Sequence, residues 1–146
     1  MELISKNNPI FAAYAFYASI LVLKMLAMSA LTARQRFRKK VFANPEDTAF
    51  KGKVKYDDPD IERVRRGHQN DLENILPFFV VGFLYILTEP SVFLAVNLYR
   101  IVTISRILHT IVYTVVVIPQ PARFLACGIP YFITAYMAIQ VVFSFL

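Results

Sequence analysis

The residues that could do chemistry in this chain are polar side chains that interrupt long apolar segments. A charged group at the centre of a membrane-spanning helix costs about 2.5–3.5 kcal/mol, so such groups usually pair with one another or serve a function. One set repeats at intervals of three and four residues and shares a helical face: Arg63, Arg66, Asn70 and Glu73. A second set follows the same rule further along the chain: Arg106, His109 and Tyr113. Arg36 and Arg123 are expected to reach the same depth as these two sets.

This combination of cations, one carboxylate and neutral polar groups suits a small ligand that carries charges of both signs. Guanidinium groups hold carboxylates through paired hydrogen bonds, and Glu73 can bind an ammonium. A thiol beside Arg123 would have a lowered pKa, because the positive charge favours the thiolate. Glutathione has carboxylates, an ammonium and a thiol and therefore fits, although the residue types alone do not separate it from other zwitterions.

The alternative is that these charges pair helices or subunits, and spacing alone does not decide between pairing and ligand binding. Lys24 and Arg100 are expected to lie away from the depth of the cluster, as helix-pairing groups or as groups that reach for the membrane surface. Asp71 and His68 are three residues apart, which is compatible with a local ion pair. Cys127 is interpreted as a packing residue.

Long apolar segments must position these polar residues, and they predict membrane-spanning helices. Of the 146 residues, 57% are hydrophobic. Residues 10–31 contain one charge and residues 124–146 contain none, and each segment has the roughly 20 residues that a helix needs to cross a bilayer. We therefore expect an all-α membrane protein, a four-transmembrane-helix bundle that forms one domain over residues 1–146. The expected helices span about 9–36, 61–88, 91–118 and 121–145, with a loop over about 37–60.

The distribution of basic residues predicts the orientation of the bundle. Eleven of the 16 Lys and Arg residues lie between Arg34 and Arg66, so the positive-inside rule places the first loop in the cytosol. A net charge of +6 fits contact with anionic lipid, and we expect no nucleic-acid partner. Since Cys127 is the single cysteine, an intramolecular disulfide is excluded.

Four motifs give the chain a resemblance to a known family. They are VFANPED at 41–47, ERVRRGHQNDLENILPF at 62–78, RILHTIVY at 106–113 and PQPAR at 119–123. Together they resemble the MAPEG family of membrane proteins in eicosanoid and glutathione metabolism, over nearly the whole chain. Arg65 and Arg66 are similar to the glutathione transferase branch of this family. Gln69, Phe124 and Cys127 depart from its prostaglandin E synthase branch.

The resemblance implies a homotrimer in the endoplasmic reticulum membrane, with the outer mitochondrial membrane as an alternative. It implies glutathione bound between subunits, and a hydrophobic electrophile or lipid hydroperoxide that arrives from the bilayer, without a metal. The implied glutathione contacts are Arg36, Arg65, Arg66, His68, Asn70, Glu73, His109 and Tyr113. Arg123 matches the family's thiolate-stabilising arginine and is the implied catalytic residue, and Asp47 is a further candidate.

Three functions follow from these observations. The first is a glutathione transferase and peroxidase that activates the glutathione thiolate. The second is glutathione-dependent prostaglandin E synthesis, and the third, of another class, is non-catalytic lipid binding. Four retained residues argue against the third, because a pure lipid binder needs no anion site: Arg66, Asn70, Glu73 and Arg123. One extra residue between Tyr113 and Arg123, relative to the family, leaves the position of Arg123 open.

Overall fold

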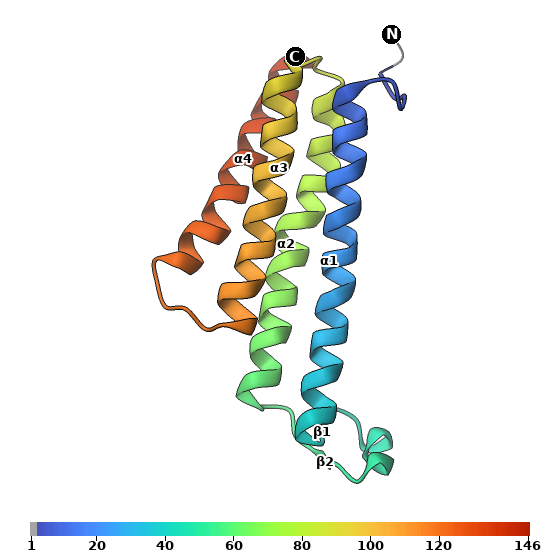
Figure 1. Ribbon diagram of the computed structural model, residues 1–146, viewed down its shortest axis with the longest axis vertical. Helices are drawn as coiled ribbons and strands as arrows, with labels where there is room; N and C mark the ends of the chain where they lie inside the picture. Colours follow the sequence, from blue (N-terminus) through green and yellow to red (C-terminus); the bar gives the residue numbers. More distant parts are fainter. Residues whose placement is uncertain (1–2) are drawn as a thin grey trace.

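The computed structural model describes residues 3–146 of the chain. Within these residues, four long helices run alternately up and down in a single bundle (Figure 1). They are α1 (Pro9–Lys39), α2 (Pro59–Ile86), α3 (Val92–Thr110) and α4 (Ala122–Ser144). The expected all-α four-helix architecture is therefore confirmed.

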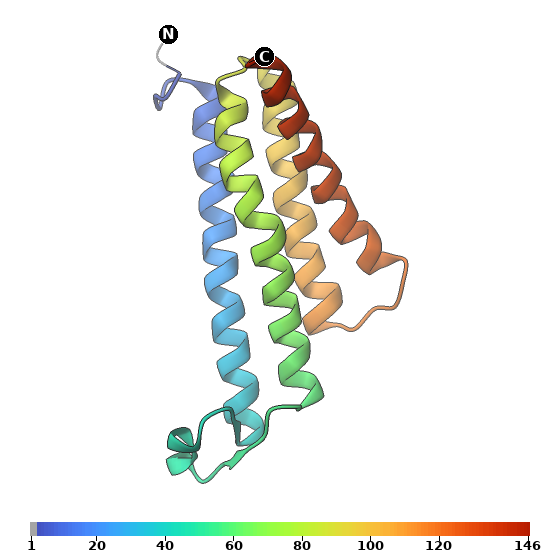
Figure 2. The same cartoon turned by 180° about the vertical axis from the view of Figure 1, so that it is seen from behind.

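The packing order places α2 and α3 between the other two helices, since α1 and α4 each pack against both of them. The beginning of α1 and the C-terminus lie at one end of the bundle, which we call the terminal end (Figure 1). The opposite end, the loop end, holds the segment between α1 and α2. This segment contains a 3₁₀ helix, η1 (Pro45–Phe50), and two short parallel strands, β1 (Val41–Phe42) and β2 (Lys53–Val54). Figure 2 shows that α1 and α2 extend furthest at the loop end, and that α4 leans away from its neighbours there.

Capping residues explain where the first two long helices begin. Asn8 and Asp58 each accept hydrogen bonds from two backbone N–H groups of the following turn. Each is followed by a proline, which has no N–H to satisfy at the first helical position. As a result α2 begins at Pro59, two residues before its expected start at 61. Helix α1 runs past its expected end at 36 to Lys39, and stops where Lys40 takes a left-handed conformation with φ 53°.

The largest difference from expectation lies after α3, where a helix to residue 118 was expected. The α-helix ends at Thr110 and is followed by one π-helical turn, η2 (Ile111–Val115). The N–H of Val116 donates to the carbonyl oxygen of Ile111 at 2.8 Å, and Val116 itself has extended backbone angles that end the helix. Two features oppose a helix here: the run of β-branched residues 115–118, and Pro119, which disfavours helical geometry in the residue before it.

Aromatic side chains fill the middle of the bundle toward its terminal end. The rings of Tyr14, Phe78 and Tyr99 meet with centroids 5.7–6.4 Å apart. The hydroxyl of Tyr99 donates to the carbonyl oxygen of Gly82 at 2.9 Å, and that of Tyr14 donates to the carbonyl oxygen of Phe79 at 2.7 Å. The polar tips of this aromatic core are therefore satisfied by α2.

The outside of the bundle is strongly apolar. Within the described residues, three helical segments are long and apolar enough to cross a membrane: Pro9–Lys39, Val92–Val115 and Ala122–Ser144. Helix α2 is not among them, because its first half carries the charged residues. Large side chains such as Phe93 and Phe143 are 82% and 71% exposed. A continuous surface of this kind is suited to lipid rather than to water.

Candidate functional site

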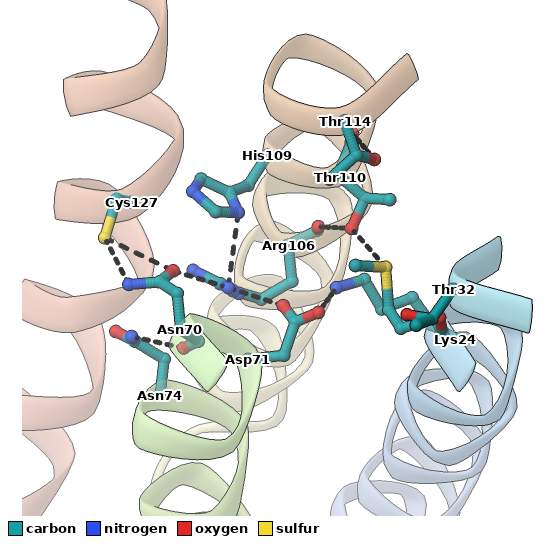
Figure 3. A network of polar contacts seen from close by, with 11 residues as sticks. Lys24, Thr32, Asn70, Asp71, Asn74, Arg106, His109, Thr110, Thr114 and Cys127 are labelled. Carbon is teal, nitrogen blue, oxygen red and sulfur yellow. Dashed lines mark hydrogen bonds and ion pairs between the residues drawn. The ribbon is translucent and has the colours of Figure 1, made fainter. Parts of the chain in front are cut away.

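A buried ionic network joins three helices beneath the candidate site (Figure 3). Asp71 of α2 has no exposed surface and accepts a hydrogen bond from Lys24 Nζ of α1. Its other carboxylate oxygen accepts from Arg106 Nη2 of α3 at 2.5 Å. Since the three side chains are at most 8% exposed, one buried carboxylate is the counter-ion of two buried cations. The network therefore has a net positive charge inside the bundle.

This network corrects two expectations. The suggested local pair of Asp71 with His68 is wrong, because Asp71 points into the bundle. Lys24 pairs helices as expected, but it lies within the polar cluster rather than away from its depth. Arg100 also pairs helices, since its Nε donates to the hydroxyl of Tyr17 on α1 at 3.0 Å. An intramembrane lysine predicts an acidic partner, and that signal could have identified Asp71 from the sequence.

Arg106 connects the ionic network to two further polar side chains. Its Nη2 donates to Asn70 Oδ1 at 2.9 Å and lies 3.4 Å from His109 Nδ1. Asn70 Nδ2 in turn lies 3.7 Å from Cys127 Sγ on α4. Cys127, interpreted as a packing residue, therefore contacts the site through its sulfur. Nε and Nη1 of Arg106 have no hydrogen-bond partner within residues 3–146.

Two adjacent pockets contain most of the expected ligand residues. The first, the outer pocket, has a volume of about 330 Å³ and is lined by Glu62, Arg65, Arg66, His68, Gln69 and Leu72. The second, the inner pocket, has a volume of about 240 Å³ and is lined by Arg66, Gln69, Asn70, Glu73, His109 and Tyr113. Arg66 and Gln69 belong to both. The pockets therefore bring together all the expected glutathione contacts except Arg36.

Arg123 reaches the inner pocket by way of an aromatic stack. The rings of His109 and Tyr113 lie parallel within 12°, with centroids 5.4 Å apart. The guanidinium carbon of Arg123 lies 5.2 Å from the centre of the Tyr113 ring, a cation–π distance. The extra residue after Tyr113 left the position of Arg123 open, and the structure places Arg123 beside the Tyr113 ring. Nε of Arg123 is buried and has no hydrogen-bond partner among the described residues.

Three expected residues lie apart from the two pockets. Arg36 is half-buried in the last turn of α1, twelve residues beyond Lys24 and therefore about 18 Å closer to the loop end at ~1.5 Å per residue. Arg63, on the same stripe as Arg66, is part of neither lining. Asp47 belongs to η1, where its carboxylate accepts a hydrogen bond from Asn44 at 3.3 Å. Within one chain these residues are not assembled with the inner pocket.

An apolar cavity of about 470 Å³ adjoins the inner pocket between α2 and α4. Three of its seven lining residues are aromatic and one carries a carboxylate: Glu73, Asn74, Phe124, Cys127, Gly128, Tyr131 and Phe132. Because Glu73 lines both spaces, the charged pocket and the apolar cavity share a wall. A polar ligand and an apolar ligand can therefore be held side by side.

These features define a multi-pass membrane protein with a small-molecule site: the helices have apolar outer faces, a buried ionic network joins three of them, and a polar pocket lies beside an apolar one. The sequence matches the MAPEG family over residues 14–143, and the chain belongs to this family. It is 46% identical over 144 residues to microsomal glutathione S-transferase 1 of Sus scrofa, which covers 94% of this chain and 92% of that protein. The human protein of the same name is 44% identical with the same coverage. Prostaglandin E synthase of Bos taurus is 37% identical over 140 residues, 94% of this chain and 91% of that protein.

Proposed function

We propose that this protein is a membrane-bound glutathione transferase that activates the glutathione thiolate for attack on hydrophobic electrophiles. The proposal is supported by the relatives named microsomal glutathione S-transferase 1. The observation that carries it is the inner pocket, in which a carboxylate, an arginine and neutral donors line one space beside Arg123. No such set is needed by a protein that binds only lipid.

Charged residues in or beside the pocket can bind three of the ionisable groups of glutathione. Arg66 can hold a carboxylate, and Glu73 can bind the ammonium. Arg123, at the far side of Tyr113, provides positive charge where the thiol would ionise. Catalysis then consists of stabilising the thiolate and holding it against the electrophile. The carbon–sulfur bond forms as the leaving group departs with its electron pair.

The second substrate is proposed to come from the bilayer through the apolar cavity between α2 and α4. With an aryl halide, the product is a thioether and a halide ion. With a lipid hydroperoxide, two glutathione molecules give glutathione disulfide, while the hydroperoxide gives an alcohol and water. Both reactions begin with the thiolate attacking an apolar partner beside it, and the reduction of a hydroperoxide also consumes the second glutathione.

The active form is proposed to be a homotrimer with glutathione between subunits. Support comes from α2, whose exposed face carries Arg65, Arg66 and Glu73 next to apolar turns. Charges at this depth are costly against hydrocarbon, whereas a second subunit would cover them. Arg36 of a neighbouring subunit could then complete the site. We place the protein in the endoplasmic reticulum membrane, with the loop end toward the cytosol, where glutathione is plentiful.

The test is conjugation of glutathione to a chlorinated dinitrobenzene by the purified protein in detergent. Turnover no faster than the uncatalysed reaction would reject the proposal. Arg123→Ala should reduce kcat/KM on the order of 100-fold, as loss of an anion-stabilising group does elsewhere. It should also abolish the near-ultraviolet absorbance of bound thiolate. Arg38→Ala removes an exposed arginine of α1 and serves as the matched control.

Prostaglandin E synthesis is the second candidate, favoured by the 37% identity to the synthase of Bos taurus. Offering prostaglandin H and measuring the ratio of enzymatic to spontaneous product separates it from the transferase proposal. Glutathione binding measured by calorimetry separates both enzymes from a lipid-binding protein.

A further inference from the structure

The buried arginine of α3 contacts two pocket residues through a single nitrogen. Arg106 Nη2 lies 2.9 Å from Asn70 Oδ1 and 3.4 Å from His109 Nδ1, while it also donates to Asp71 at 2.5 Å. A guanidinium has only donors. Its Nη2 carries two hydrogens, which go to Asp71 and Asn70 at the two shorter distances, so Nδ1 of His109 at 3.4 Å makes only a longer, shared contact. An N–H of any of these partners aimed at the guanidinium would meet a donor and be repelled.

This condition fixes how both pocket residues are oriented. The atom of Asn70 that Arg106 contacts must be the carbonyl oxygen, which leaves the NH₂ group to donate elsewhere. Cys127 Sγ lies 3.7 Å from this Nδ2 and 3.8 Å from Oδ1. Nδ1 of His109 must carry a lone pair, so a neutral ring bears its proton on Nε2. Figure 3 shows that the contact from Arg106 ends at one ring nitrogen of His109 and that the other ring nitrogen has no contact drawn.

The ionic network holds Arg106 in the position that this requires. Asp71 binds the same Nη2 atom, and Lys24 binds the second oxygen of Asp71. All three side chains are nearly or fully buried, and they join α1, α2 and α3. The stack of His109 on Tyr113 keeps the imidazole plane from turning. The ring can therefore neither flip nor take a second proton without facing the guanidinium with a hydrogen.

We propose that Arg106 is a positioning residue that presents Asn70 and His109 to the inner pocket as neutral hydrogen-bond donors for the anionic groups of the ligand. The inference rests on glutathione as the proposed ligand. Without Arg106, both side chains could turn an acceptor toward the ligand, and each would then repel a carboxylate or thiolate. Arg106 itself lines neither pocket and acts through its two neighbours.

The first test reads the proton position on the ring directly. Selective nitrogen-15 labelling of the two histidines, His68 and His109, in the detergent-solubilised protein shows which ring nitrogen bears the hydrogen. His68→Gln assigns the signals. We expect the His109 proton on Nε2, in the presence and in the absence of glutathione. A proton on Nδ1 would overturn the proposal, whatever the activity of the enzyme.

The second test uses side chains that imitate one ring nitrogen each. The amide of His109→Gln reaches the position of Nε2 and should keep glutathione affinity within a few-fold. His109→Asn offers its amide only near the position of Nδ1 and should raise the Kd about 10- to 100-fold, as loss of a hydrogen bond to a charged group does. Equal losses in both variants would contradict the assigned orientation.

The third test changes the partner in α2. Asn70→Asp keeps the oxygen that Arg106 binds but replaces the donor with an acceptor, so the fold should persist while KM for glutathione rises at least tenfold. A KM within twofold of the unmodified value would overturn the proposal. If the unmodified protein binds no glutathione, the proposed function fails and this role fails with it. If it binds and turns over while the Asn and Gln variants of His109 behave alike, only the positioning role fails.

Discussion

Replacing Asp71 by asparagine should destabilise the bundle far more than replacing Lys24 by methionine. Asp71→Asn keeps the shape of the side chain but leaves Lys24 and Arg106 buried together without a counter-charge. Removing one member of a buried ion pair costs about 3–5 kcal/mol. Lys24→Met instead leaves one acid and one base, and places an apolar chain of similar length in an apolar span. Its effect on the free energy of unfolding should stay within about 1 kcal/mol.

The measurement is unfolding of the purified protein in mixed micelles as the fraction of a denaturing detergent rises, followed by helix content. The double variant Lys24→Met with Asp71→Asn should be more stable than Asp71→Asn alone, because only Arg106 then remains uncompensated. Equal costs for the two single variants would refute the reasoning. The reasoning would also be refuted if the double variant lost as much free energy of unfolding as the two single variants together, since the two side chains would then act independently.

Three further outcomes follow from single contacts. Glu73→Gln should weaken glutathione binding about tenfold by removing the counter-charge of the ammonium, yet leave unchanged the binding of an analogue without the amino group, measured by calorimetry. Gly67→Ala should cost about 1 kcal/mol, because its methyl group would lie 2.8 Å from Thr114 Cγ2. Combining it with Thr114→Ser, which lacks that carbon, should turn the loss into a gain in detergent unfolding. The hydrogen bond from Lys39 lowers the pKa of Asp58. The ionised carboxylate therefore stabilises the start of α2 at pH values above the ordinary pKa of an aspartate, and this stabilisation is lost as the pH falls through the lowered pKa. Amide hydrogen exchange in the first turn of α2 should show this pH dependence in the unmodified protein, and Asp58→Asn should not show it.

The inner pocket could be predicted from the sequence because one helix supplies most of it. Arg66, Asn70 and Glu73 follow the 3.6-residue period of α2, so their common face is fixed before any other helix is placed. The same holds for His109 and Tyr113, which meet as a stack one turn apart on α3 and η2. Local periodicity thus determined which side chains share a wall.

The contacts between helices could not be predicted in the same way. Lys24, Asp71 and Arg106 meet because three helices have a particular register along the bundle, which spacing within one helix does not report. The sequence places Arg36, at the expected end of the first helix, at the depth of the polar cluster, and the family resemblance makes it a glutathione contact. Because α1 is helical through Lys39, Arg36 lies about 18 Å beyond Lys24 at ~1.5 Å per residue and is therefore nearer the loop end.

The apolar cavity between α2 and α4 also determines which concentration unit applies to the hydrophobic substrate of this protein. On the proposed function, the hydrophobic acceptor enters this cavity from the bilayer and therefore reaches it after dissolving in the membrane. The relevant quantity is then moles of acceptor per mole of lipid. Adding empty vesicles at a fixed total amount of acceptor would lower the amount of acceptor per mole of lipid, although its concentration per litre is constant. Two acceptors with identical chemistry would differ in apparent KM by the ratio of their partition coefficients.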